Sequence, residues 1–206
     1  MPPGKLILFE GVDGCGKSTQ RDLAYDFFSK KYSCLKVREP GSVKAAEDIR
    51  KILLHSDYNL GKITELMLFE AARAQFVEEI LKPSLIQGKI IFCDRYYYST
   101  IAYQGFGRGI DLKDINYLNK VASQGIKPDL IFIFDIPAEE IFKRMKKQGR
   151  AKDRIEKEAK DFHAKVRKGY LFIGKKYPSI YLLDGTRSIE DLNKEILSAI
   201  KENLNL

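Results

Sequence analysis

Five short segments of the chain have the apolar composition of β-strands. They cover residues 6–9 (LILF), 33–38 (SCLKVR), 89–93 (KIIFC), 130–134 (LIFIF) and 179–183 (SIYLL). Apolar runs that do not alternate with polar residues predict strands buried on both faces of a sheet. Such burial is typical of a parallel sheet that helices cover on two sides.

Between these segments, apolar residues recur three or four positions apart, which is typical of amphipathic helices. This spacing predicts a helix after the first strand, helices over residues 43–55 and 63–87, and a closing helix. Ser188 and Asp191 fit a capping box at the start of that last helix. Alternating strands and helices predict an α/β fold, whose ligands gather at the carboxyl ends of the strands.

Length and composition fit one soluble domain that spans residues 1–206. The formal net charge of +8 comes from basic residues spread along the chain, so a solvated surface explains it and no nucleic-acid partner is expected. No leader segment or membrane-length apolar run is recognisable, which predicts a cytoplasmic protein without a membrane partner. The cysteines, Cys15, Cys34 and Cys93, lack metal-type spacing and are expected to be reduced thiols.

A glycine-rich turn connects the first strand to the first helix. The pattern G-x-x-x-x-G-K-[ST] is filled by Gly11, Gly16, Lys17 and Ser18. Its backbone N–H groups form a concavity for phosphate, Lys17 reaches the β- and γ-phosphates, and the Ser18 hydroxyl is a ligand for Mg²⁺. The residues predicted to bind ATP are Gly11, Val12, Asp13, Gly14, Cys15, Gly16, Lys17, Ser18 and Thr19.

A phosphate loop alone is shared by GTPases, motors, nucleic-acid ATPases and small-molecule kinases. The pair Asn119-Lys120 is not followed by an aspartate two positions later, so the guanine-reading element N-K-x-D is missing. No apolar strand ends in the Asp-Glu pair of mechanical ATPases. These absences favour a kinase.

Short motifs along the chain then narrow the class of kinase. The phosphate-loop motif FEGVDGCGKST is followed by R-E-P-G at residues 38–41, by F-x-x-x-R at 69–73, by D-R-Y at 94–96 and by A-Y-Q-G at 102–105. In this order the motifs resemble the thymidylate kinase family over nearly the whole chain. The resemblance implies a three-layer P-loop NTPase fold with a five-stranded parallel sheet flanked by helices and a short mobile lid at about residues 143–156. It also implies transfer of the γ-phosphate of ATP to dTMP in dTTP biosynthesis, with Mg²⁺, by a homodimer.

The same resemblance assigns residues to the thymine and sugar of dTMP. Phe69 would stack on the thymine ring, and Arg73 would donate a hydrogen bond to its exocyclic oxygen. A four-residue spacing places both on one helix face, although core packing remains an alternative for Phe69. Thr100 and Gln104 would read the base edge, and Tyr103 would exclude a ribose 2′-hydroxyl.

A second implied set handles phosphate and metal. Arg95 would hold the α-phosphate of dTMP, and Arg38 would support the same region. Asp13 would face away from the triphosphate and accept a hydrogen bond from the 3′-hydroxyl. Asp94 would bind Mg²⁺ together with Ser18.

Residues 143–154 (KRMKKQGRAKDR) are rich in cations and resemble the lid of the family. A charge run is often only a solvated face, which remains the alternative for the lysines. The variable positions of the phosphate loop carry no cation, so Arg144 and Arg150 are the candidates to neutralise the transferring phosphoryl group. With Lys17 and Arg95 they complete the expected catalytic set, and Arg154 and Glu156 end the lid.

Two other functions remain open at this point. A deoxynucleoside kinase would share the loop and lid but needs a carboxylate base for a neutral hydroxyl acceptor, and Glu39 can serve as one. A nucleotide-dependent switch protein is the second alternative. The acceptor phosphate of dTMP is already anionic, so the main interpretation requires no general base.

Overall fold

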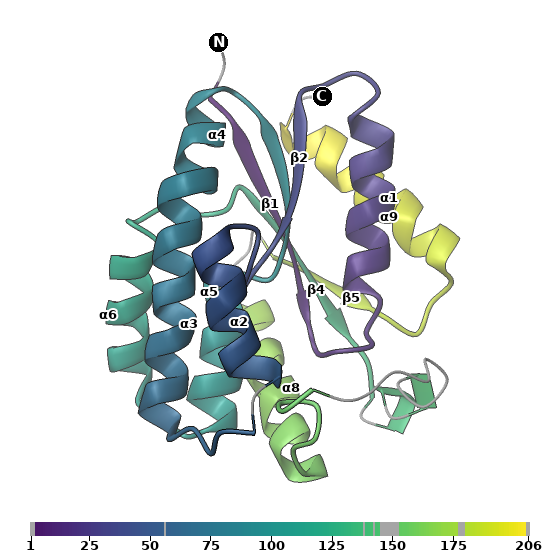
Figure 1. Cartoon of the computed structure of the whole chain (residues 1–206). Helices are drawn as coiled ribbons and strands as arrows, with labels where there is room; N and C mark the ends of the chain where they lie inside the picture. The colour runs from purple at the N-terminus through teal and green to yellow at the C-terminus, as the bar shows by residue number, and fades with distance from the viewer. Residues whose placement is uncertain are drawn as a thin grey trace.

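The five apolar segments form one parallel sheet. The computed structural model describes residues 3–204 except 56, 138, 142, 145–152 and 177–179. The strands lie in the order β2-β3-β1-β4-β5 (Figure 1). Their bounds are β1 Lys5–Gly11, β2 Cys34–Arg38, β3 Ile90–Asp94, β4 Leu130–Asp135 and β5 Ile180–Asp184. The predicted strands and their parallel arrangement are confirmed.

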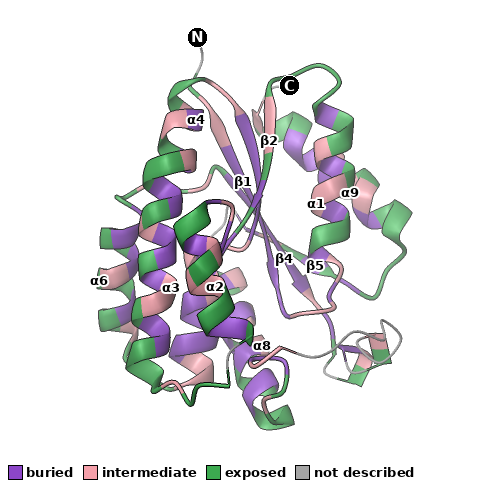
Figure 2. Ribbon diagram, in the orientation of Figure 1, coloured by how far each residue is buried: buried purple, intermediate pink, exposed green. Residues whose placement is uncertain are grey.

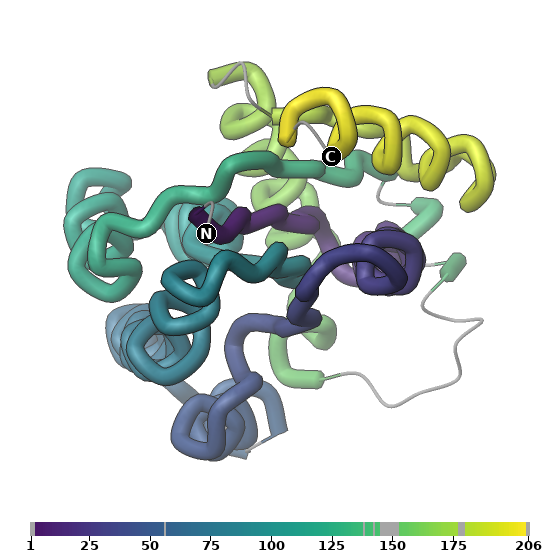
Figure 3. The backbone as a smooth tube through the Cα atoms, turned by 90° about the horizontal axis from the view of Figure 1, so that it is seen from above, coloured from purple at the N-terminus to yellow at the C-terminus, as the bar shows by residue number. Residues whose placement is uncertain are grey.

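Helices cover both faces of this sheet (Figures 1 and 3). On one face lie α1 Lys17–Phe28 and α9 Ile189–Leu204. On the other lie α3 Lys62–Phe76, η1 Val77–Leu81, α4 Lys82–Ile86, α5 Tyr97–Thr100, η2 Ile101–Gly107 and α8 Lys160–Lys176. Two further helices, α2 Lys44–His55 and α6 Leu112–Ala122, pack against α3.

Burial explains why the strands are apolar throughout. In the central strands β1, β3 and β4, nearly every side chain is buried (Figure 2). The register pairs Phe9 with Asp94 and Gly11 with Phe134. Because all strands run in the same direction, the segments that follow them meet at one edge of the sheet, as the sequence predicts.

The helix predicted over residues 63–87 is confirmed, but it is not uniform. It consists of α3, a π-helical turn η1 and α4, ending at Ile86. The capping interaction before α9 is confirmed as well, since the Ser188 hydroxyl accepts a hydrogen bond from Asp191 N at 3.1 Å. Three further helical segments, η2, α6 and α8, were not predicted from the sequence, although the buried residues of α6 and α8 recur at helical spacing.

Cys15, Cys34 and Cys93 are all free thiols. Among the helices of the described residues, none combines the length and apolarity needed to cross a membrane.

Helix α8 packs closely on η2 through Gly169. A Cβ at this position would lie 2.8 Å from the Ala102 Cα and 3.1 Å from the Phe106 Cδ2. At Gly174, further along α8, the three atoms nearest to a Cβ all belong to Leu182, with Cδ1 at 3.4 Å, which is ordinary van der Waals contact. The close approach brings Tyr170 of α8 into the centre of the site described below.

We expect Gly169→Ala to lower the free energy of unfolding by about 1–3 kcal/mol, because backbone and ring atoms must move apart. The matched change Gly174→Ala should cause no loss and add up to about 1 kcal/mol, since alanine favours helix more than glycine does. Urea denaturation of both variants measures the difference. Equal stability of the two variants would contradict the proposed packing constraint.

Candidate active site

The phosphate loop joins β1 to α1 through backbone conformations that suit glycine. Gly11 has φ 142°, and a Cβ there would lie 2.7 Å from the Phe134 carbonyl oxygen. Gly16 has φ 98° and is the N-cap of α1, where no side chain caps the helix. The first N–H groups of α1 are therefore directed at the loop concavity, together with the positive end of the helix dipole. This arrangement fits a polyphosphate.

Lys17 is buried, and its Nζ lies 3.4 Å from Asp13 Oδ1. Asp13 also accepts hydrogen bonds from Arg95 Nη2 at 2.7 Å and from the Tyr103 hydroxyl at 3.1 Å. Burial opposes ionisation of Asp13, but the charges of Arg95 and Lys17 outweigh it and hold the pKa of this carboxyl well below its ordinary value. Asp13 is thus a fixed anion between two cations.

Arg95 directly follows β3 and has φ 70°, a left-handed conformation uncommon for arginine. This turn directs its guanidinium at Asp13, while Nη1 donates to the Tyr170 hydroxyl at 2.9 Å and to Ser99 Oγ at 3.1 Å. The guanidinium also lies 5.0 Å from the ring centre of Tyr103. Arg95 is held from several sides, which compensates for a strained backbone.

Beneath Arg95 lies Glu10, a charged residue inside the apolar strand β1. It is fully buried and accepts hydrogen bonds from Tyr96 N at 2.7 Å, Ser99 Oγ at 2.7 Å and the Tyr170 hydroxyl at 3.0 Å. Burial raises its pKa, and the nearby charge of Arg95 offsets part of that effect. Glu10 was not predicted to support the site, although a glutamate within a buried strand is a signal for such a role.

Ser18 and Asp94 lie together at the start of α1 and the end of β3. The Ser18 hydroxyl donates a short hydrogen bond to Asp94 Oδ2. Arg21 Nη1 lies 3.8 Å from the same oxygen. A hydroxyl and a carboxylate oxygen, next to the phosphate loop, form a donor set of the type that Mg²⁺ prefers.

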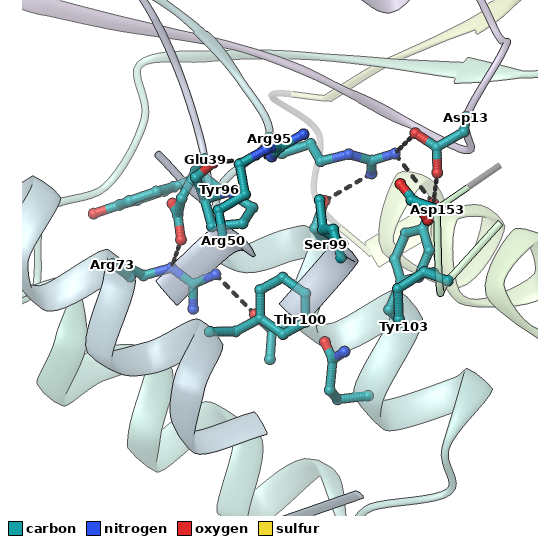
Figure 4. Close-up of a pocket in the computed structure, with 15 residues that line it drawn as sticks. Asp13, Glu39, Arg50, Arg73, Arg95, Tyr96, Ser99, Thr100, Tyr103 and Asp153 are labelled. Atoms are coloured by element: carbon teal, nitrogen blue, oxygen red, sulfur yellow. Dashed lines mark hydrogen bonds and ion pairs between the residues drawn. The ribbon is translucent and has the colours of Figure 1, made fainter. Parts of the chain in front are cut away.

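Arg73 lies at the other end of the neighbouring pocket and is 2% exposed. Its Nε lies 2.6 Å from Glu39 Oε1, and its Nη1 donates to Glu70 Oε1 and Asn119 Oδ1, both at 2.7 Å. Its Nη2 donates to Thr100 Oγ1 at 2.8 Å (Figure 4). Burial raises the pKa of Glu39 to about 8, although the Arg73 charge opposes this. The sequence did not identify Glu70 or Asn119 as partners of Arg73.

The predicted acceptor residues do come together. Phe69, Arg73, Thr100, Tyr103 and Gln104 line one pocket, and Asp13 and Arg95 line it as well. In Figure 4, Glu39 and Arg73 lie at one side of this pocket, and Asp13 and Tyr103 lie at the other. This acceptor pocket, named for its predicted ligand, thus has one end with a buried cation and a second end beside the phosphate loop.

Arg38 is not part of this pocket. Its guanidinium pairs with Glu47, with Nη2 2.9 Å from Oε1, and half of its side chain is exposed. The pocket is lined instead by Arg50, from α2, whose Nη1 donates to the Pro40 carbonyl oxygen at 2.9 Å. Sequence spacing did not predict Arg50 rather than Arg38 as a pocket residue, because only tertiary packing brings α2 to the pocket.

Of the residues predicted to form a lid, Arg144 lines the second pocket, which is formed by the phosphate loop. Its Nη2 donates to the Gly185 carbonyl oxygen at 3.0 Å, and its Nε donates to Glu140 at 3.1 Å. The expected catalytic residue Arg150 lies outside the described residues, as do Lys146 and Lys147.

The structure describes residues 153–156, the end of the predicted lid. Asp153 lines the acceptor pocket and exchanges hydrogen bonds with Glu156, from Asp153 N at 3.0 Å and from Glu156 N at 2.8 Å. Arg154 donates to the Leu53 carbonyl oxygen at 2.7 Å. This segment is thereby fixed against the end of α2.

Both pockets include Asp13, so they meet at the phosphate loop. One offers backbone N–H groups and cations for a polyphosphate, and the other offers an aromatic ring, hydrogen-bonding side chains and arginines. Two anionic ligands can therefore be brought together at Asp13 and Arg95. Such a geometry suits transfer of a phosphoryl group between them.

Comparisons with known proteins give the same assignment. The sequence model of the family described as thymidylate kinase matches residues 9–196. The chain is 40% identical over 203 residues to a thymidylate kinase of Thermoanaerobacter sp. (strain X514), covering 98% of this chain and 99% of that protein. It is 43% identical over 200 residues to one of Thermosipho africanus, covering 97% and 98%. The crystal structure of thymidylate kinase from Ehrlichia chaffeensis matches with a TM-score of 0.80 at 32% identity, over 97% of this chain and 100% of that chain. The chain therefore belongs to the thymidylate kinase family.

Proposed function

We propose that this protein transfers the γ-phosphate of ATP to dTMP, giving dTDP and ADP for dTTP synthesis. The observation that carries the proposal is the meeting of two pockets at Asp13, one lined by the phosphate loop and the other by Phe69 and Arg73. Family membership supports the same reaction.

On the donor side, the phosphate loop would bind the triphosphate of ATP through its backbone N–H groups and Lys17. Ser18 and Asp94 would hold Mg²⁺, which would supply positive charge to the triphosphate. ATP phosphates complete the coordination of Mg²⁺ in such sites, so a single carboxylate with a hydroxyl is a sufficient protein contribution.

On the acceptor side, Phe69 would stack on thymine, while Arg73, Thr100 and Gln104 would hydrogen-bond its edge. Arg73 is already oriented by Glu39 and Glu70, so it would recognise an exocyclic oxygen without reorganisation.

At the other end of the pocket, Arg95 and Arg50 would bind the acceptor phosphate. Asp13 would accept a hydrogen bond from the 3′-hydroxyl, and Tyr103 would pack against the sugar. Arg38 pairs with Glu47 outside the pocket, so we assign it only a supporting role, through the neighbouring turn.

Catalysis would consist of in-line positioning and charge neutralisation. The variable positions of the phosphate loop carry no cation, and one of them is the anion Asp13. Arg144 and Arg150 of the proposed lid, about residues 143–156, would therefore supply positive charge together with Lys17 and Arg95. Arg144 already lines the phosphate-loop pocket, which supports this role.

The alternative of a deoxynucleoside kinase depends on Glu39 as the base. Glu39 contacts Arg73 at 2.6 Å, and both side chains are 2% exposed. Glu39 lies with Arg73 on the side of the pocket away from Asp13 (Figure 4). A base for a 5′-hydroxyl is needed beside Asp13 and Arg95, so this position favours dTMP as the acceptor.

We further propose one domain over residues 1–206, a cytoplasmic location and a homodimer. The dimer is supported by exposed apolar side chains on two adjacent helices: Ile63 (51%) and Met67 (49%) on α3, and Tyr117 (69%) and Val121 (59%) on α6. Each pair has a four-residue spacing, so each lies on one helix face. Exposed apolar side chains on two helices that contact each other favour association with a second copy.

The reaction is tested by coupled measurement of ADP. We expect ADP formation with ATP, Mg²⁺ and dTMP, and little ADP with thymidine or without acceptor. Chelation of Mg²⁺ should abolish the rate, and added Mg²⁺ should restore it. Equal ADP formation with and without dTMP would contradict a kinase and favour a nucleotide-dependent switch.

We expect Arg144→Met to lower kcat by about 10²-fold with little change in the KM for dTMP, because the charge acts on the transferring group. The neighbouring change Lys143→Met, at an exposed position, serves as the control and should have a small effect. Single-turnover rates separate chemistry from product release. A near wild-type rate for Arg144→Met would leave Arg150 or Arg95 as the source of the charge.

The proposed dimer predicts that Met67→Glu or Tyr117→Glu yields monomers, since a charge would be buried in the apolar contact. Leu23→Glu, at a similarly apolar position on α1, should leave the dimer intact. Sedimentation velocity across a range of concentrations measures the mass. A monomeric wild-type protein would refute the dimer without affecting the proposed reaction.

A further inference from the structure

A buried carboxylate behind the acceptor pocket contacts one of the proposed base-reading residues. Glu65, in α3, is 0% exposed. Its Oε1 accepts hydrogen bonds from Gln104 Nε2 and Arg108 Nε, both at 3.0 Å. Its Oε2 accepts from Arg108 Nη2 at 3.0 Å and from Arg154 Nη2 at 2.6 Å. In each of these hydrogen bonds, a carboxylate oxygen of Glu65 accepts and the partner donates.

The charge state of Glu65 follows from these partners. Burial alone raises the pKa of a carboxyl group, but the hydrogen bonds from Arg108, Gln104 and Arg154 outweigh it and lower the pKa of Glu65. An ionised carboxylate can only accept hydrogen bonds. The Gln104 amide must therefore present its NH₂ group to Glu65, because its oxygen would be repelled there.

This orientation fixes what Gln104 offers to a ligand. Gln104 is 2% exposed and lines the acceptor pocket. The amide nitrogen and oxygen diverge from one carbon, so with Nε2 bound to Glu65 the acceptor Oε1 is the atom left for a base. Thymine and uracil carry an N–H donor at ring position 3, whereas neutral cytosine has an unprotonated acceptor nitrogen there.

We propose that Glu65 is a positioning residue that sets base specificity by locking the Gln104 amide with its oxygen toward the acceptor base. The locked amide pairs with a ring N–H and opposes the ring nitrogen of cytosine. An amide without this partner can turn over and accept either base. The inference rests on the proposed dTMP kinase activity and concerns a residue that itself does not touch the substrate.

The test compares kcat/KM for dTMP and for dCMP. In Glu65→Gln, a neutral side chain can both donate and accept, so Gln104 is free to turn over. We expect the ratio of kcat/KM for dTMP to kcat/KM for dCMP to fall at least about tenfold, mainly through a lower KM for dCMP. Glu65→Asp keeps the charge for the arginines but withdraws the carboxylate from Gln104, and it should lower the ratio in the same direction. Thermal melting identifies folded variants.

The matched control is Arg108→Gln, which removes two hydrogen bonds from Glu65 without touching Gln104. We expect lower stability and an unchanged ratio. In a Gln104→Leu background, Glu65→Asp should have no further effect on the ratio, since Glu65 acts through that amide.

Three results would overturn the inference. The first is a wild-type ratio of kcat/KM for dTMP to that for dCMP in either folded Glu65 variant, and the second is an equally lowered ratio in Arg108→Gln. The third is an unchanged ratio in Gln104→Leu, and this result would overturn the inference even if both Glu65 variants fail to fold. A wild-type protein inactive on dTMP would refute the proposed function instead, before any variant is compared.

Discussion

The ion pair between Asp13 and Arg95 is the contact on which the rest of the site depends. It joins the loop after β1 to the residue after β3, at 2.7 Å, and both residues line the acceptor pocket. Parallel neighbouring strands bring these two segments to one edge, because Phe9 is in register with Asp94. The guanidinium of Arg95, which follows a left-handed backbone, then donates to Ser99 and Tyr170, and both of these hydroxyls donate to Glu10 of β1.

Buried charge determines the geometry at the base end of the pocket. A guanidinium removed from water is stable only with partners, and Arg73 has two carboxylates, an amide and a hydroxyl. Burial raises the pKa of Glu39 to about 8 against the charge of Arg73, and the charges of Glu39 and Glu70 in turn hold the pKa of Arg73 above its ordinary value, although burial opposes this. Glu65 follows the same principle with two arginines. These clusters fix donors and acceptors before any ligand arrives, so recognition requires little reorganisation.

The sequence predicts the features that depend on local pattern. Unalternated strands, the phosphate loop and the Phe69/Arg73 spacing each follow from residues near one another in the chain, whereas the strand order β2-β3-β1-β4-β5 was not predicted. The partners of the site could not be predicted in this way. Arg50, Glu65, Asn119 and Tyr170 reach the pocket or its supports only through tertiary packing. Arg38 was predicted to support the pocket because it lies at the end of a strand, but its guanidinium pairs with the nearby Glu47 instead.

The placement of Asp13 explains why positive charge must come from elsewhere in the fold. In the phosphate loop, the charge of Lys17 is partly balanced by Asp13, and Asp13 also pairs with Arg95. A donor triphosphate and an acceptor phosphate brought together at this point repel each other unless additional cations approach. Among the described residues, Arg144 and Arg187 also line the phosphate-loop pocket, and Arg50 lines the acceptor pocket. Because Asp13, which would orient the sugar, adds negative charge at this point, arginines such as Arg50 of α2 and Arg144 after β4 are required to balance it. The residue that would position the substrate thus also determines how much positive charge the transfer requires.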